Sequence, residues 1–324
     1  MIKAAIVGAS GYTGGELVRL LLQHPEVVIT NLYSTTKGGQ PVTNAHPDLL
    51  GQTDLHFSDS LDAELDVIFL CLGHGNSKAF LEKHSFADHT RIIDLSNDFR
   101  LTADRNFQGR EFVYGLPELQ KEAIQNAKAL ANPGCFATAI QLALLPLAQS
   151  KSLKQTVHVN AVTGSTGAGV KPSATTHFSW RNQNVSWYKP FNHQHLGEIG
   201  QSLEGLQGSP ASVLFLPQRG NFSRGIFATA YTPFEGTLEE AQQLYQAFYE
   251  DAAFTQVSGQ PIGLKQVVNT NQCHLHLHKH EDVLLVTSCI DNLLKGASGQ
   301  AVQNMNLMLG LAEETGLQLK SIAF

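Results

Sequence analysis

The sequence predicts a two-domain protein in which an α/β domain is followed by an α+β domain. The chain has 324 residues, which is more than one hydrophobic core usually serves. Its first half alternates short apolar runs with helical periodicity, a pattern typical of a parallel sheet. Its second half holds mainly extended segments with few helices, which favours a mostly antiparallel sheet.

The change in pattern places the domain boundary after an apolar helical run. We expect residues 1–149 to form the first domain, with a candidate nucleophile near its end. Residues 150–299 are expected to form the second domain. The last helical pattern, within residues 300–324, has one apolar face and is expected to return to the first domain.

Composition and charge restrict the partners and the compartment. The formal net charge is -6 and there is no block of Lys or Arg, which argues against nucleic acid or an acidic membrane as the main partner. The N-terminal apolar run is too short for a secretory signal, and no stretch of 18 apolar residues follows. With four widely spaced cysteines, these features predict a cytoplasmic protein that acts on small molecules.

A glycine-rich turn lies between the first predicted strand and the first predicted helix. Gly8, Gly11 and Gly14 form a G-x-x-G-x-x-G spacing, a variant of the dinucleotide fingerprint of Rossmann domains. Glycines let backbone amides approach a pyrophosphate, and the helix N-terminus favours its negative charge. A plain tight turn is the alternative. The candidate cofactor residues here are Gly8, Ser10, Gly11, Tyr12, Thr13 and Gly14.

The end of the second predicted strand bears on the choice of cofactor. A site for NAD usually has a carboxylate there, whereas this chain reads "NLYSTTK". Ser34, Thr35 and Lys37 are suited to a 2′-phosphate, so the sequence favours NADPH/NADP+, although a solvated loop would read the same. Gly73 and His74 follow the third apparent strand, at the edge where such sheets bind ligands, and are further cofactor candidates.

Cys135, in the stretch "NPGCF", directly precedes an apolar helical run. A cysteine in that position is often a small buried hydrophobic residue. In the first turn of a helix, however, the unpaired amides and the helix dipole stabilise a thiolate, which is a good nucleophile. The other cysteines lack such a setting, since Cys71 and Cys289 lie inside apolar strand patterns.

A nucleophilic cysteine needs a proton acceptor, and the segment "NHQHLGEIG" supplies two candidates, His193 and His195. Glu198 follows His195 by three residues and would share its face if a helix begins there. A polar surface loop is the alternative. Four further histidines alternate between residues 274 and 280, where a solvated face of an edge strand is a simpler explanation than a metal site. We therefore expect no metal.

Six segments together resemble the N-acetyl-gamma-glutamyl-phosphate reductase family, within the wider aspartate-semialdehyde dehydrogenase group. They occur in the family's order from Gly8 to Asn306: "GASGYTGGEL", "LSNDFRL", "YGLPEL", "NPGCFATA", "HQHLGE" and "DNLLKGASGQAVQNMN". The resemblance implies an NADPH-dependent enzyme of arginine biosynthesis. It also implies a Rossmann domain and an α+β catalytic domain that mediates homodimer or homotetramer contacts.

The resemblance also implies a mechanism. The Cys135 thiolate would attack the acyl-phosphate carbonyl and expel inorganic phosphate, which leaves a thioester for reduction by NADPH. His195 matches the second histidine of the family's H-x-H-x-x-E segment and would handle the proton, with His193 as its rival. Asn292 and Gly296, with Lys295 and Gly299, match the family segment beside the nicotinamide.

Five residues are candidates for contact with the substrate. Asn132 would donate to the thioester oxygen, and the loop "TGSTGAG" offers hydroxyls and amides to an anion. Arg100 is either a guanidinium near the site or an ion-pair partner of Asp98. The set is Asn132, Ser165, Gly167, Arg100 and Glu198.

The chain departs from the family pattern in segments expected to contact the acyl group. Val170 and Lys171 stand where the family usually has an arginine, and Gln194 stands between the two histidines. The same chemistry on N-succinyl-glutamyl phosphate, aspartyl phosphate or an aminoadipyl analogue therefore remains an alternative. A cofactor-binding sensor without catalysis is a third possibility.

Overall fold

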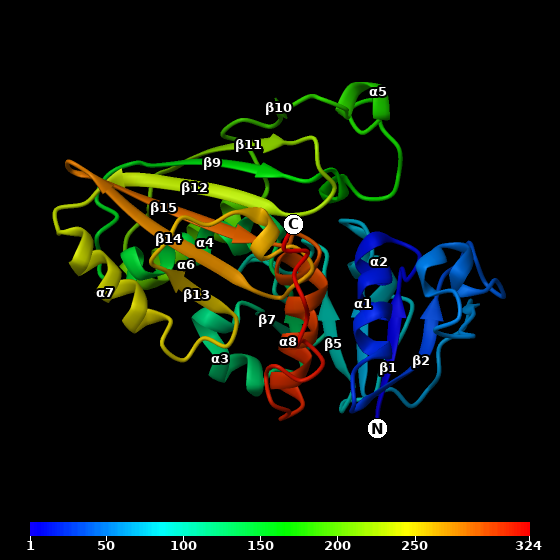
Figure 1. Ribbon diagram of the computed structural model, residues 1–324. Coiled ribbons are helices and arrows are strands. Elements are labelled where there is room, and N and C mark those ends of the chain that lie inside the picture. Colours follow the sequence, from blue (N-terminus) through cyan, green and yellow to red (C-terminus); the bar gives the residue numbers. More distant parts are fainter. The chain divides into compact units, whose positions relative to one another are not determined.

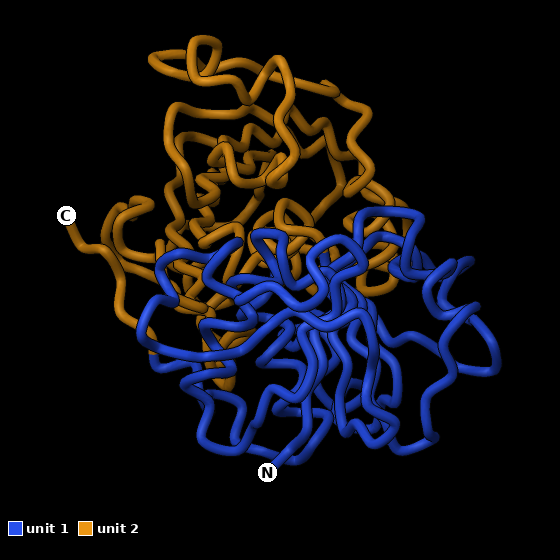
Figure 2. Tube along the Cα trace, turned by 90° about the vertical axis from the view of Figure 1, so that its right-hand side faces the viewer, with its two compact units in different colours: residues 1–133, 297–318 blue, residues 134–296, 319–324 orange.

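The protein, seen here as a computed structural model that describes all 324 residues, divides into two compact units. Unit 1 holds residues 1–133 and 297–318, and unit 2 holds residues 134–296 and 319–324 (Figure 2). The division therefore falls before Cys135 and not after residue 149. The reason is that the helix over residues 135–149 packs against helices and strands of unit 2.

Unit 1 is built on an eight-stranded sheet in the order β3-β2-β1-β4-β5-β8-β7-β6. All neighbours run parallel except the hairpin of β6 and β7. This is the doubly wound order in which ligands bind at the carboxyl ends of the strands, as the sequence predicts. The strands are β1 (Ile2–Val7), β2 (Val27–Tyr33), β3 (Phe57–Ser58), β4 (Val67–Leu70), β5 (Arg91–Asp94), β6 (Asn106–Phe107), β7 (Arg110–Tyr114) and β8 (Ala129–Ala131).

Four helices belong to unit 1: α1 (Tyr12–Leu22), α2 (Asn76–Leu81), α3 (Pro117–Gln125) and α8 (Gly299–Met308). Helix α8 contacts α1, α3 and β5, and it is buried on all sides and not on one face alone (Figure 1). Two of its asparagine side chains donate to backbone carbonyls of unit 1. The Asn304 amide donates to the Gly115 carbonyl at 2.8 Å, and the Asn306 amide donates to the Glu313 and Thr315 carbonyls at 3.1 and 2.9 Å.

Unit 2 is built on a seven-stranded sheet in the order β10-β11-β9-β12-β15-β14-β13. The pairs β11–β9 and β13–β14 are parallel and the other four are antiparallel, so the predicted mostly antiparallel sheet is confirmed. The strands are β9 (Val157–Thr163), β10 (Ser186–Trp187), β11 (Val213–Arg219), β12 (Ile226–Pro233), β13 (Thr255–Ser258), β14 (Cys273–His280) and β15 (Val283–Ile290).

Helix α4 (Cys135–Gln149) forms the centre of the core of unit 2. All its residues from Phe136 to Ala148 are buried, because the helix packs against α6 (His195–Gln207), α7 (Leu238–Phe248), β12 and β15 (Figure 1). A helix that is apolar on every side is expected only in such a position. The remaining helix is the short α5 (Phe178–Arg181).

Helix α4 contains a proline, Pro146, at an interior position. Proline has no N–H, so it leaves the carbonyl four residues earlier, that of Leu142, without its helical donor. The Tyr249 hydroxyl donates to this carbonyl at 2.5 Å, and the Tyr245 hydroxyl donates to the next carbonyl, that of Ala143, at 2.5 Å. The two tyrosines thus complete the hydrogen bonding of a buried helix.

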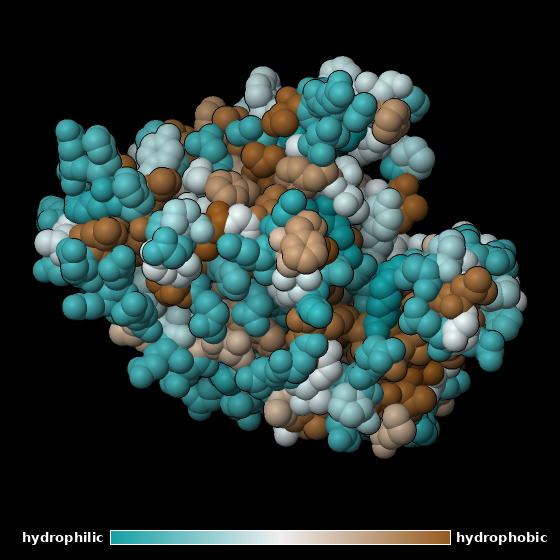
Figure 3. Space-filling view, in the orientation of Figure 1, coloured by the Kyte–Doolittle hydropathy of each residue, from teal (hydrophilic) through white to brown (hydrophobic).

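Hydrophilic residues dominate the outline of the face shown in Figure 3, and hydrophobic residues are interspersed among them. None of the helices has both the length and the apolar character needed to span a bilayer.

Candidate active site

The glycine turn of unit 1 has the geometry that close approach to a phosphate requires. Gly8 lies at φ +79°, and a Cβ there would stand 2.5 Å from the Cys71 carbonyl oxygen. A Cβ on Gly14 would stand 2.6 Å from the Cα of Ala9, whereas one on Gly11 would meet nothing closer than 3.6 Å. Gly11 is the N-cap of α1, whose first turn has no acidic residue. These residues fit a dinucleotide pyrophosphate at the helix N-terminus.

The residues between these glycines differ in exposure. Tyr12 is 40% exposed and Ser10 is half-buried. The Thr13 carbonyl accepts a hydrogen bond from the Ser298 hydroxyl at 2.8 Å, so the segment that precedes α8 is attached to the turn. The glycine turn is therefore held by the C-terminal part of unit 1 as well as by β1.

No carboxylate follows strand β2. Ser34 is buried, and its amide donates to the Ser58 carbonyl at 2.8 Å, whereas Thr35 is exposed and Lys37 is half-buried. The Lys37 ammonium and the Thr35 hydroxyl are thus more accessible to a phosphate than the Ser34 hydroxyl is.

The end of strand β4 holds the exposed pair Gly73 and His74. His74 accepts a hydrogen bond at Nδ1 from the Asn97 amide at 3.1 Å. The N-terminus of α2 is already capped, because the Asp98 carboxylate accepts from the Gly75 amide at 2.6 Å and from the next two free amides at 3.0 and 3.2 Å. The Asp98 carboxylate therefore already occupies the N-terminus of α2, whereas the first turn of α1 has no acidic residue.

Arg100 is 5% exposed and donates to the Leu95 carbonyl at 2.9 Å. It lies near Asp94, which is fully buried and accepts from the hydroxyls of Ser77 and Ser96 at 2.5 and 2.7 Å. Burial raises the pKa of Asp94 to about 6, although both hydroxyls and Arg100 lower it. The surroundings of Arg100 are thus those of an interior residue.

Cys135 is the first residue of α4 and is half-buried. The amide of its neighbour Gly134 donates to Glu198 Oε2 at 2.9 Å, and Glu198 Oε1 lies 3.9 Å from His195 Nε2. The Glu198 side chain is 3% exposed and that of His195 is 7% exposed. One carboxylate thus joins the turn before the thiol to the first residue of α6, where a helix begins as the sequence predicts.

Both histidines also lie against Phe136, the residue after the thiol. The ring centroids of Phe136 and His193 are 5.7 Å apart, those of Phe136 and His195 are 6.3 Å apart, and those of the two histidines are 4.5 Å apart. The His195 amide donates to His193 Nδ1 at 3.2 Å. Because that nitrogen accepts, the proton of neutral His193 is on Nε2.

Position 296 requires a glycine because it lies directly against the nucleophile. A Cβ at Gly296 would lie 2.8 Å from the Cβ of Cys135, and the Gly296 amide donates to the Asp291 carbonyl at 2.9 Å. Asn292 is 2% exposed, and its amide group bonds to the Gly225 amide at 2.7 Å and to the Thr166 hydroxyl at 3.0 Å. Asn292 is therefore engaged within unit 2.

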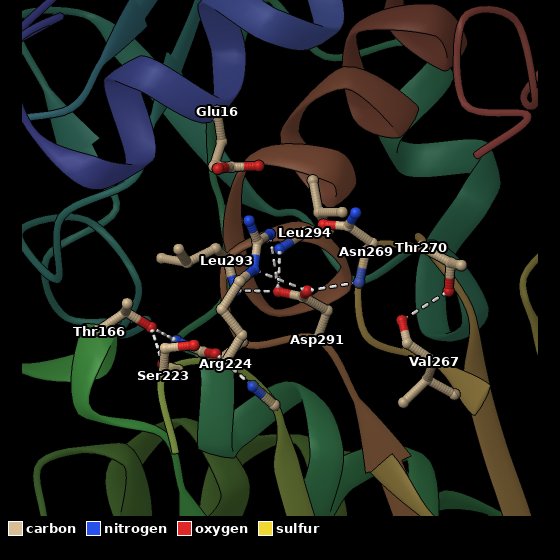
Figure 4. A network of polar contacts seen from close by, with 12 residues as sticks. Glu16, Thr166, Ser223, Arg224, Val267, Asn269, Thr270, Asp291, Leu293 and Leu294 are labelled. Carbon is tan, nitrogen blue, oxygen red and sulfur yellow. Dashed lines mark hydrogen bonds and ion pairs between the residues drawn. The ribbon is translucent and has the colours of Figure 1, made fainter. Parts of the chain in front are cut away.

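The ion pair of Arg224 and Asp291 was not anticipated from the sequence (Figure 4). Asp291 is fully buried and accepts from Arg224 Nε at 3.0 Å and Nη2 at 3.2 Å, and also from the amides of Asn269 and Leu293, each at 2.8 Å. The pair fixes the start of the segment that carries Gly296. No local spacing reveals it, because 67 residues separate its members.

The loop with Ser165 and Gly167 differs from the expected anion-binding nest. The amides of Ser165 and Thr166 donate to the carbonyls of Phe222 and Ser223 at 2.8 and 3.1 Å, and the Gly167 amide is directed at a carbonyl of its own turn at 3.3 Å. These amides are thus hydrogen-bonded inside the fold. The half-buried Ser165 hydroxyl remains the candidate group.

Asn132 is 1% exposed and serves unit 1. Its Nδ2 donates to the Ala297 carbonyl at 3.1 Å, and its Oδ1 accepts from Asn304 Nδ2 at 3.0 Å. The side chain therefore positions the segment that enters α8, which differs from the expected contact with a thioester oxygen.

Two residues that the sequence did not single out are linked to His193: Tyr188 packs on it, and Arg219 packs on Tyr188. The ring centroids of Tyr188 and His193 are 5.9 Å apart, and the Arg219 guanidinium carbon is 4.6 Å from the centroid of Tyr188. Burial raises the pKa of Tyr188 to about 12, with a further rise from Cys135 and an opposing effect of Arg219. The only signal was the long polar and aromatic stretch that contains Tyr188.

The three other cysteines are poor nucleophiles. Burial raises the pKa of Cys71 to about 12 and raises the pKa of Cys289 as well, while Cys273 is fully buried. The alternating histidines lie on β14, which pairs with β13 on one side and β15 on the other, so the expected edge strand is wrong for its first half. His276 bonds to the Ser258 carbonyl at 3.0 Å. The structure contains no group of three metal-ligating side chains.

Comparisons with known proteins agree with this architecture. A family model described as "Semialdehyde dehydrogenase, NAD binding domain" matches residues 3–127, and one described as "Semialdehyde dehydrogenase, dimerisation domain" matches residues 135–292. Among solved structures, aspartate semialdehyde dehydrogenase II of Vibrio cholerae has a TM-score of 0.70 at 15% identity and covers 96% of this chain and 98% of its own. The enzyme of Candida albicans, solved with NADP, has a TM-score of 0.69 at 14% identity and covers 95% of this chain and 98% of its own. These likenesses show the fold.

Curated relatives are much more similar in sequence. The N-acetyl-gamma-glutamyl-phosphate reductase of Christiangramia forsetii is 58% identical over 99% of both chains. That of Flavobacterium johnsoniae is 56% identical over 100% of both chains. Identity of this extent along the full length, with the two semialdehyde dehydrogenase matches, shows that the chain belongs to the N-acetyl-gamma-glutamyl-phosphate reductase family.

Proposed function

We propose that this chain catalyses the NADPH-dependent reduction of N-acetyl-gamma-glutamyl phosphate to N-acetylglutamate semialdehyde and phosphate, a step of arginine biosynthesis. The observation that carries the proposal is the position of Glu198 between the thiol turn and the histidine. Its Oε2 accepts from the Gly134 amide at 2.9 Å, and its Oε1 lies 3.9 Å from His195 Nε2. It holds a helix-terminal thiol and an acid–base group in one arrangement. The relatives named for this reaction supply the substrate.

Cys135 supplies the nucleophile. Its place at the N-terminus of α4 stabilises the thiolate, because the first amides of a helix have no helical acceptor and the dipole is positive there. The thiolate adds to the acyl-phosphate carbonyl, and phosphate leaves with the bonding electrons, which gives a thioester on Cys135. NADPH, when bound, supplies the hydride that takes the acyl group to the aldehyde level.

His195 is the stronger candidate for proton transfer. Neutral His193 already accepts at Nδ1 from the His195 amide and carries its proton on Nε2, so it is set to donate. His195 faces the Glu198 carboxylate, which stabilises the imidazolium that forms when the ring accepts the thiol proton. It returns that proton to the oxygen of the hydride adduct, which gives a thiohemiacetal on Cys135. Collapse of this thiohemiacetal breaks the C–S bond, passes the hydroxyl proton to the departing sulfur by way of the histidine, and releases the semialdehyde with the free thiol.

Unit 1 would bind the cofactor. Gly8 and Gly14 permit close approach of a pyrophosphate to the turn, and the N-terminus of α1 stabilises its charge. Lys37 and Thr35 would hold the 2′-phosphate, since no carboxylate follows β2. We therefore expect kcat/KM to be much higher with NADP+ than with NAD+.

The decisive experiment is an assay of phosphate-dependent NADP+ reduction by N-acetylglutamate semialdehyde. Wild-type protein should prefer this substrate to N-succinylglutamate semialdehyde and to aspartate semialdehyde. Cys135→Ala should abolish turnover and keep NADPH affinity, because the nucleophile and the glycine turn lie in different units. Cys273→Ala is the matched control and should stay active. Turnover by Cys135→Ala, or its loss of NADPH affinity, would contradict the proposed roles.

We also propose that the protein is a cytoplasmic homodimer or homotetramer that associates through unit 2. Seven of the fourteen exposed large hydrophobic side chains lie between residues 170 and 214. The family model matched by unit 2 is described as a dimerisation domain. Such a concentration of exposed apolar residues is typical of an interaction surface. The four cysteines are thiols, which suits a reducing compartment.

A further inference from the structure

Arg219, the last residue of β11, carries a charge that no acidic group of the protein balances. It forms no ion pair, and its Nε is buried without a hydrogen-bond partner. A buried donor left in this state is costly, and buried cations are normally paired. An anionic ligand at the guanidinium would balance this charge.

The guanidinium is held in place by an aromatic ring. Its central carbon lies 4.6 Å from the centroid of Tyr188, a typical cation–π arrangement. Tyr188 follows β10, which pairs with the end of β11 so that Ser186 lies opposite Arg219. The Arg219 side chain also hydrogen-bonds to Tyr188. The tyrosine stays protonated at neutral pH, so its hydroxyl is a hydrogen-bond donor and not a competing anion.

A second guanidinium nearby makes the site more positive. Arg181 is 6% exposed and spends its donors on neutral oxygens: the carbonyls of Thr175, Asn184 and Arg219 and the hydroxyl of Ser186. Burial is the main cause that lowers the pKa of Arg181, and the charge of Arg219 lowers it further. The guanidinium of Arg181 is thus fully occupied in holding the strand end, whereas the guanidinium of Arg219 can still bind a ligand.

The position of this pair relates it to the reacting thiol. Tyr188 packs on His193 at 5.9 Å between ring centroids, and His193 packs on Phe136, which follows Cys135. The thiol and Tyr188 interact electrostatically. Arg219 is therefore linked through the rings of Tyr188 and His193 to Phe136, the residue after the thiol, and all of these residues belong to unit 2.

We propose that Arg219, oriented by Tyr188, binds the α-carboxylate of the acyl-phosphate substrate. This inference rests on the proposed function. The phosphate is attached to the carbon that Cys135 attacks, whereas the α-carboxylate is separated from that carbon by three further carbons. A guanidinium set back from the thiol by two aromatic rings suits the more distant anion, and Arg is the residue best matched to a carboxylate.

The first test compares two aldehydes, N-acetylglutamate semialdehyde and 4-acetamidobutanal, which lacks the carboxylate. Arg219→Gln should lower kcat/KM for the first about 10- to 100-fold, mainly through KM, as expected for a lost charged hydrogen bond. It should leave kcat/KM for the second, and KM for phosphate and NADP+, unchanged. Arg219→Lys should restore part of the loss. A rise in KM for phosphate, or an equal loss on both aldehydes, would overturn the proposal.

The second test does not depend on the identity of the substrate. 5-Iodopentanoate and 5-iodopentanamide both alkylate Cys135 with loss of iodide, but only 5-iodopentanoate has a carboxylate, which three carbons separate from the reacting carbon as in the substrate. Arg219→Gln should lower the rate ratio of 5-iodopentanoate to 5-iodopentanamide several-fold. Lys154→Gln removes a charge from an exposed lysine paired with Glu235 and should leave the ratio unchanged. An unchanged ratio in Arg219→Gln would refute an anion site beside Cys135, whereas a changed ratio without reductase activity would refute only the proposed reaction.

Discussion

At the scale of single residues, Glu198 organises the proposed centre. Its two oxygens serve different partners, the Gly134 amide before the thiol and the His195 imidazole on its own helix. From the sequence, this carboxylate is a candidate for contact with the substrate. Because the side chain is 3% exposed and its oxygens face the protein, its role is to position the nucleophile and the acid–base group.

Replacing Glu198 by Gln therefore tests positioning without deleting the side chain. The amide oxygen can still accept from Gly134, but the charge that stabilises the His195 imidazolium is lost. We expect kcat to fall at least about 10-fold, with KM for substrate and the thermal midpoint nearly unchanged. Steady-state kinetics and thermal unfolding measure these quantities. Glu204→Gln, an exposed position on the same helix, should behave as wild type. A higher KM at constant kcat would instead indicate direct substrate contact.

Asp94 makes stability depend on pH. Its pKa is raised from 3.8 to about 6 because the carboxyl is fully buried. The folded state thus prefers the neutral form, so this group opposes folding increasingly as pH rises from about 4 to about 6. Relative to wild type, Asp94→Asn should gain about 2 kcal/mol in free energy of unfolding between pH 4 and pH 7. Urea unfolding at the two pH values measures the gain, and a constant difference would disprove the linkage.

At the scale of elements, α4 is maintained by contacts far away in sequence. Tyr249 donates to the Leu142 carbonyl, which Pro146 deprives of its helical donor. Tyr249→Phe removes only that hydroxyl and should lower the free energy of unfolding by about 1–3 kcal/mol, the cost of a buried acceptor left unsatisfied. Denaturant unfolding measures it. Tyr231→Phe, on a half-buried position of β12, should cost clearly less; equal losses would mean that the carbonyl finds another donor.

Local signals predicted elements well and long-range assembly poorly. The glycine turn was found because the strand, the glycines and the helix are contiguous in sequence. His195 and Glu198 were found because side chains three positions apart on a helix share a face. The sequence places helix α4 in the first domain, whereas the structure places it in unit 2. Its apolar surface can pack against either unit, so only the packing itself decides between them. The ion pair of Arg224 with Asp291 and the internal use of the Ser165 amide depend on residues more than 50 positions away.

At the scale of the whole molecule, the exposed aromatic residues of unit 2 need an explanation. Trp187 is 64% exposed, Phe178 is 76% exposed and Phe191 is 59% exposed, all within one stretch. If they form the interface proposed above, Trp187→Glu should shift the mass measured by light scattering after size exclusion towards the monomer. Ile322→Glu, at another exposed apolar position, should not. A wild-type monomer at micromolar concentration would contradict the interface.

The contrast among the four thiols has a practical use. Burial raises the pKa of Cys71 and Cys289 and Cys273 is fully enclosed, whereas Cys135, which is partly exposed, is the one thiol that begins a helix. A maleimide dye applied to the folded protein should therefore attach at a single position. The stoichiometry of labelling would then report the number of competent active centres in a preparation, so that turnover numbers can be expressed per intact site.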